Sequence, residues 1–196
     1  MLRRITFDAR PLPLSLKLTD VRTYLFIAAF VVLSVLTPWA LHLYPLAGPT
    51  FLPMHLFIFV AALAGGWQAG LVVGLLTPFA SFAVSGMPPA TILPQLAVEV
   101  TAYGLIAGVL RQKYNLNVFL SLLGAMAGGR IALLVAVFAI QAITGHVYSP
   151  LGPTATPLAA VWNTIAQSWP GMLVQLAVIP AAFWAIGRLL AGRRAD

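Results

Sequence analysis

Charged residues are nearly absent from two long stretches of this chain. Residues 23–110 contain one charge, Glu99, and residues 114–187 contain one more, Arg130. Apolar residues fill both stretches, with short interruptions rich in Gly, Pro and Ser. Because a helix needs about 20 predominantly apolar residues to cross the hydrocarbon core of a bilayer, the pattern predicts an all-α membrane protein.

The interruptions divide the apolar stretches into six predicted transmembrane helices. A Gly-Gly pair at 65–66 breaks a run that is too long for one span, and a breaker segment at 85–89 precedes the fourth span. Residues 145–157 form a predicted loop, a short helix is expected over 158–167, and Pro180 should kink the last span. The predicted spans are Tyr24–Leu43, Pro53–Ala64, Trp67–Val84, Leu93–Leu110, Val118–Thr144 and Pro170–Leu190.

The basic residues indicate the orientation of the spans. Six spans place both termini on one side of the membrane, and every Lys and Arg except Arg130 falls on that side. By the positive-inside rule, this side is cytoplasmic. We therefore expect a cytoplasmic N-terminal segment over residues 1–22, one six-helix transmembrane domain over 23–190 and a cytoplasmic tail over 191–196.

Composition excludes several classes of function. The chain is 61% hydrophobic and 8% charged, against about 25% charged in soluble domains. Its net charge of +7 lies at predicted helix ends and forms no basic stripe with interleaved aromatics, so no nucleic-acid partner is expected. The absence of cysteine excludes disulfides and cysteine-ligated metals. No nucleophile motif, phosphate-binding loop or carboxylate pair is present, so we expect neither an enzyme nor a cofactor.

Three polar side chains are predicted to lie in one layer of the membrane. At about 1.5 Å per helical residue, Glu99 and Arg130 lie roughly 18 Å from the cytoplasmic edge, and Gln175 lies roughly 20 Å from it. Gln95 and Tyr103 flank Glu99 at i−4 and i+4, on the same face of the helix. Ionisable residues inside a membrane are costly and usually functional, so these five side chains are candidate substrate-binding residues.

Two interpretations of this layer remain open. In one, Glu99 and Arg130 form a buried ion pair that only fixes how two helices pack, and Gln175 satisfies a spare donor. In the other, they line a pocket and contact a polar solute. A buried pair contributes little net stability, which favours the second interpretation. Arg130 would suit an anionic ligand, but if Glu99 neutralises it, a neutral or cationic heterocycle is equally possible.

The outer ends of the predicted spans supply further candidates. Asn163 and Gln167 are i,i+4 neighbours if their segment is helical, which favours ligand contact over a role in the interfacial aromatic belt. Trp39 and His146 are additional candidate substrate contacts, although tryptophan at this depth is also typical of the belt. The three histidines lack metal-ligand spacing, so no metal site is expected.

Glycines recur at helical spacing in three predicted spans. They form Gly66-x3-Gly70-x3-Gly74, Gly104-x3-Gly108 and Gly124-x3-Gly128. Such spacing lets helix backbones approach closely in lipid. The spacing fits packing within the chain, and the ridge of Gly66, Gly70 and Gly74 is also a candidate docking surface for another membrane subunit.

Four segments resemble the substrate-binding S components of energy-coupling factor (ECF) vitamin transporters. They are FLPMHLFIFVAALAGGWQAGLVVGLLTPFASFAVSGMPP (51–89), VEVTAYGLIAGVLRQK (98–113), AMAGGRI (125–131) and PGMLVQLAVIP (170–180). The resemblance implies a six-helix protein in a prokaryotic cell membrane, with both termini cytoplasmic. It also implies high-affinity capture of a vitamin-like molecule near the outer face, under the first, third-to-fourth and fifth-to-sixth helix connections. Its implied partners are a transmembrane coupling subunit and two ATP-binding-cassette (ABC) ATPases.

The first predicted helix departs from the family pattern. S components typically carry Ala-x3-Ala there for docking on the coupling subunit, whereas here Ala28 precedes Val32 and Ala29 precedes Leu33 at that spacing. Ala28 and Ala29 remain candidate docking residues. The main alternative function is a self-sufficient secondary transporter, but the chain shows no internal repeat or pair of broken helices. A membrane enzyme lacks a catalytic pair, and a scaffold leaves Glu99 and Arg130 unexplained.

Overall fold

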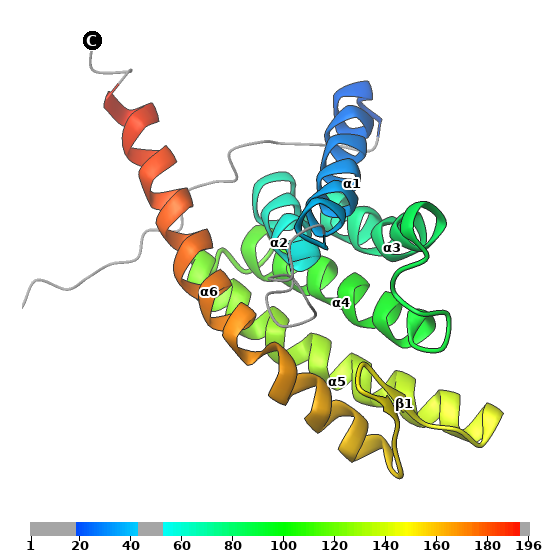
Figure 1. Cartoon of the computed structure of the whole chain (residues 1–196). Coiled ribbons are helices and arrows are strands. Elements are labelled where there is room, and N and C mark those ends of the chain that lie inside the picture. The colour runs from blue at the N-terminus through cyan, green and yellow to red at the C-terminus, as the bar shows by residue number, and fades with distance from the viewer. Residues whose placement is uncertain (1–18, 43–52, 193–196) are drawn as a thin grey trace, which may run out of the picture.

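The computed structural model describes residues 19–42 and 53–192, which form six helices and one small hairpin (Figure 1). The predicted all-α fold is confirmed for these residues apart from the hairpin. The elements are α1 (Val21–His42), α2 (Pro53–Gly65), α3 (Trp67–Ser85), α4 (Leu93–Gln112), α5 (Val118–Thr144), β1 (Tyr148–Ser149), β2 (Gly152–Pro153) and α6 (Pro157–Gly192).

Local capping explains several helix ends. The Asp20 carboxylate accepts a hydrogen bond from the second backbone N–H of α1 at 2.9 Å, and the Asn117 side chain does the same near the start of α5 at 2.8 Å. Such caps satisfy N–H groups that have no partner inside the helix. Gly86 and Gly145 end α3 and α5 in the left-handed conformation, with φ of 70° and 72°, which glycine adopts without steric cost.

α4 lies in the middle of the bundle, with α3 and α5 packed against it (Figure 1). The glycines explain how closely α3 and α4 approach. A Cβ on Gly70 would overlap the backbone of Gly104, and one on Gly74 would overlap the backbone of Val100. Gly70 and Gly74 therefore serve packing within the chain, the first of the two alternatives, and their predicted role as a docking surface is wrong because α4 covers them.

The turn between α2 and α3 lies beside the C-terminal end of α4. Gly66 has φ of 88°, which lets the chain reverse without a loop. The backbone N–H of Trp67 donates to the Gln112 side chain at 3.1 Å, and Lys113 lies 5.4 Å from the centre of the Trp67 ring. A Cβ on Gly108 would overlap this turn, so Gly66 is also used within the chain. The α2–α3 and α4–α5 connections thus share one end of the bundle.

Five of the described helices are long and apolar enough to cross a membrane, namely α1, α3, α4, α5 and α6. The 13-residue α2 is shorter. At about 1.5 Å per residue it measures roughly 20 Å, against about 30 Å for the hydrocarbon core. The chain is a multi-pass membrane protein.

The C-terminal third differs from the prediction. A single 36-residue helix, α6, replaces the expected short helix and separate span, and Pro170 lies inside it rather than at a helix start. A proline removes one backbone N–H but does not end a membrane helix whose freed carbonyl finds another partner. The predicted loop at 145–157 contains the β1–β2 hairpin, in which Tyr148 pairs with Pro153 and Ser149 with Gly152.

Candidate functional site

The centre of the site is an ion pair between α4 and α5. Arg130 Nη1 donates to Glu99 Oε1 at 2.6 Å, and the side chains are 10% and 2% exposed, respectively. Both positions were predicted to lie at the same depth, and this contact confirms that they meet. An ion pair this buried needs further hydrogen bonds, because desolvation of two charges can exceed their attraction.

Tyr103 supplies one of those hydrogen bonds. Its hydroxyl donates to the same Glu99 oxygen at 2.7 Å, from one helical turn further along α4. The ring lies directly against Gly129 of α5, where a Cβ would overlap it, and His55 of α2 contacts it edge-on with ring centroids 5.5 Å apart. Gly129 thus makes room for the ring next to Arg130.

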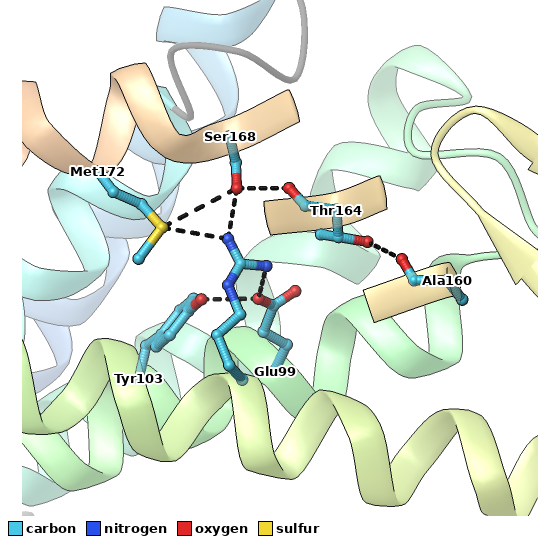
Figure 2. Close-up of polar contacts among 7 residues, drawn as sticks. Glu99, Tyr103, Ala160, Thr164, Ser168 and Met172 are labelled. Carbon is cyan, nitrogen blue, oxygen red and sulfur yellow. Dashed lines mark hydrogen bonds and ion pairs between the residues drawn. The ribbon is translucent and has the colours of Figure 1, made fainter. Parts of the chain in front are cut away.

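α6 completes the coordination of the guanidinium. Arg130 Nη2 donates to Ser168 Oγ at 2.5 Å and to Met172 Sδ at 3.4 Å. Ser168 in turn donates to the Thr164 carbonyl at 2.6 Å. Figure 2 shows Thr164, Ser168 and Met172 on one side of this contact and Glu99 and Tyr103 on the other. We call Glu99, Tyr103, Arg130 and Ser168 the polar cluster.

Three residues of the site, Thr164, Ser168 and Met172, were not predicted from the sequence. They lie at i, i+4 and i+8 on one face of α6, a spacing that would have predicted one polar stripe if α6 had been treated as continuous. The expected break at Pro170 hid this register. Gln175 also belongs to α6 and is 1% exposed. It was expected to accept a hydrogen bond from Arg130, but Arg130 Nη2 donates to Ser168 and Met172 instead.

A small cavity lies next to Glu99, below the β1–β2 hairpin. It measures about 20 Å³, and Gln95, Glu99 and Pro150 are among its lining residues. Gln95 ties the hairpin to α4, because its Nε2 donates to the Tyr148 carbonyl at 3.0 Å. On the other side of the hairpin, His146 and Tyr148 line an open depression of about 250 Å³. Glu99 and Gln95 therefore line the cavity together, as their shared helix face predicted.

The other candidate residues lie outside the cavity lining. Trp39 is half exposed on α1, and His146 is exposed with its ring 6.2 Å from that of Tyr148. Asn163 and Gln167 are half-buried on α6, one turn apart as predicted. Gln167 Oε1 is buried with no hydrogen bond from the described residues. Their role as ligand contacts stays a prediction.

The groups at the site are suited to hydrogen bonding and apolar contact with a small molecule. Within residues 19–42 and 53–192, no group of three His, Cys, Asp or Glu side chains lies close enough to hold a metal ion. The site combines a fixed ion pair, hydroxyl and amide groups, and apolar walls. Apolar walls with a few placed polar groups are the composition of small-molecule sites, whose volumes of about 300–1,000 Å³ are much larger than this cavity.

Comparison with known proteins gives one match. Residues 21–183 match the family described as ECF transporter, substrate-specific component. The matched range covers α1 to α5 in full, α6 as far as residue 183, and every residue of the polar cluster. No curated protein and no solved structure matches the chain.

Proposed function

The chain belongs to the substrate-specific components of ECF transporters, and from this premise we propose that it captures a vitamin or related small water-soluble molecule at the outer face of the membrane. The polar cluster with its adjoining cavity is the observation that carries the proposal. Four side chains from α4, α5 and α6 are hydrogen-bonded to one another there, and the hairpin residue Pro150 lines the cavity beside them. A buried ion pair adds little stability on its own, so a ligand-binding role gives a reason for its presence.

We further propose that the chain crosses the membrane six times with both termini cytoplasmic. The α2–α3 turn lies beside Lys113 at the end of α4, and this end of the bundle carries Arg111 as well. The connection from Gly86 to Ile92 and the hairpin at the other end carry no basic residue. Basic connections on one side and uncharged ones on the other fit the positive-inside rule, with α2 as the crossing that returns the chain to the cytoplasm.

Cysteine labelling tests this orientation. The chain has no cysteine, so single cysteines at Leu151 in the hairpin and at Tyr114 in the α4–α5 connection can be compared. The native side chains are 65% and 68% exposed, so both sites are matched in access. In intact cells, a membrane-impermeant maleimide should label Leu151→Cys and not Tyr114→Cys, and both should react after the cells are opened. Labelling of Tyr114→Cys in intact cells would reverse the proposed orientation.

Energy for uptake is proposed to come from partners, a transmembrane coupling subunit and two ABC ATPases, because the sequence contains no phosphate-binding loop. Ala28 and Ala29 lie exposed on α1, which keeps this helix available as the docking face. The small-residue ridge on α3 is covered by α4 and does not share that role.

Reconstitution separates this function from a self-sufficient carrier. Purified protein alone in liposomes should bind solute but not accumulate it, because nothing in the chain couples binding to an energy source. The measurement is retention of labelled compounds from a vitamin mixture, with and without a proton or sodium gradient. Liposomes without protein are the control. Gradient-driven accumulation by the protein alone would favour the secondary transporter and overturn the proposal.

A further inference from the structure

The walls of the cavity beside Glu99 indicate which ligand chemistry the site accepts. At about 20 Å³ the cavity holds roughly one water molecule, so a larger ligand requires its walls to move apart. Its lining contains three polar side chains, Gln95, Glu99 and Thr164, and four apolar ones, Ile92, Leu96, Leu133 and Pro150. The three polar groups therefore determine what a ligand can hydrogen-bond.

The Thr164 hydroxyl hydrogen and one of the two Gln95 amide hydrogens are already used. Thr164 Oγ1 donates its hydrogen to the Ala160 carbonyl at 2.8 Å. Gln95 Nε2 donates to the Tyr148 carbonyl at 3.0 Å, and the amide orientation is fixed because a carbonyl oxygen can only accept. The Thr164 oxygen lone pairs, the Gln95 carbonyl oxygen and one Gln95 amide hydrogen remain for a ligand.

Glu99 adds the strongest acceptor. Both hydrogen bonds to its carboxylate, from Tyr103 and from Arg130, end on Oε1. Oε2 forms no hydrogen bond within the part of the chain that the structure describes, and Figure 2 draws none to it. A carboxylate oxygen has two lone pairs and accepts charge-assisted bonds.

Arg130 is not positioned to attract an anion into the cavity. It is absent from the cavity lining, and its two terminal nitrogens donate to Glu99, Ser168 and Met172. Its Nε has no partner among the described residues but is fully buried, so a ligand does not reach it. An anion in the cavity would instead meet the Glu99 carboxylate at short range.

We propose that the site takes a ligand whose buried end carries N–H donors, such as an amine, an amidine or an amino-substituted nitrogen heterocycle, with Glu99 Oε2 as its main acceptor. This inference rests on the proposed function, since it names the chemistry of the molecule captured at that site. It also decides between the two ligand classes that the sequence left open, in favour of the neutral or cationic one.

Isosteric probes test the donor requirement. Benzamidine and benzoate have nearly the same size and shape, but the first presents N–H donors and the second presents only acceptors. In detergent, titration calorimetry with the wild-type protein should show benzamidine binding at least tenfold more tightly than benzoate. Equal or tighter binding of benzoate, or binding of neither probe up to solubility, would overturn the inference.

A matched pair of variants assigns the binding to this cavity. Thr164→Val keeps the shape of the side chain and removes its oxygen, whereas Thr164→Ser keeps the oxygen. We expect Thr164→Val to weaken benzamidine binding by about threefold to tenfold, the range for one hydrogen bond, and Thr164→Ser to bind like wild type. Thermal melts of both variants check that the fold is intact. Unchanged benzamidine affinity in a folded Thr164→Val protein would place the probe elsewhere and overturn the inference.

Identification of the co-purified ligand distinguishes this inference from the proposed function. Native mass spectrometry of gently purified wild-type protein should detect a small molecule that carries N–H donors. A bound vitamin-like anion without such donors would overturn the donor requirement and leave capture by an S component intact.

Discussion

Replacing Arg130 by methionine should lower the free energy of unfolding by about 3–5 kcal/mol, because it strands a buried carboxylate. Glu99 is 1% exposed and would keep only the Tyr103 hydroxyl as a partner, from which it accepts at 2.7 Å. For a chain of this length the loss corresponds to a fall in melting temperature of roughly 6–20 °C. Thermal melts in detergent, at fixed detergent and protein concentration, measure it.

The control is the double variant Glu99→Gln with Arg130→Met, which leaves no orphan charge. Neutral replacement of a whole buried pair is often tolerated, so the double variant should recover most of the lost melting temperature. Its ligand binding should nevertheless stay at least tenfold weaker than wild type, about 1.4 kcal/mol, since the Glu99 carboxylate is gone. Full recovery of both stability and affinity would reduce the pair to a packing element between α4 and α5.

Helix positions were predictable where glycine and proline mark them. The starts at Pro53, Trp67, Leu93 and Val118 agree with the structure to the residue, because a proline or a turn precedes or opens each helix. The rise per residue then placed Glu99 and Arg130 at one depth, and they form an ion pair. Glycine and proline at the helix boundaries, together with the helical rise per residue, were sufficient to predict the contact between Glu99 and Arg130.

The α6 side of the site was not predictable, because a proline can either open a helix or lie inside a membrane helix. Pro170 suits the first turn of a helix, but it lies inside α6, and the sequence alone does not show which carbonyls find other partners. The register linking Thr164, Ser168 and Met172 depends on that choice. The position of the hairpin was not predictable either. The hydrogen bond that holds it, from Gln95 Nε2 to the Tyr148 carbonyl, joins residues 53 positions apart.

Substitution of a glycine at the α3–α4 contact is expected to lower the stability of the protein strongly. The backbones of Gly70 and Gly104 face each other, and a Cβ on either one would overlap backbone atoms of the other helix. Backbone atoms of two packed helices cannot move aside as a side-chain tip can. Gly124 of α5 has the same spacing motif, but a Cβ there would meet only the Cδ1 tip of Leu110.

Gly104→Ala should therefore lower the free energy of unfolding by about 1–3 kcal/mol, the usual range for overpacking. The stability of Gly124→Ala should stay close to that of the wild type. Both substitutions gain about the same helix propensity, close to 1 kcal/mol, so the difference between them isolates the helix–helix contact. Melting temperatures of the two variants in the same detergent measure that difference. Because Gly104 follows Tyr103, a shift of α4 also moves the hydroxyl that Glu99 accepts from, so Gly104→Ala should weaken ligand binding as well. Equal melting temperatures for the two variants would show that α3 and α4 do not pack backbone to backbone at Gly70.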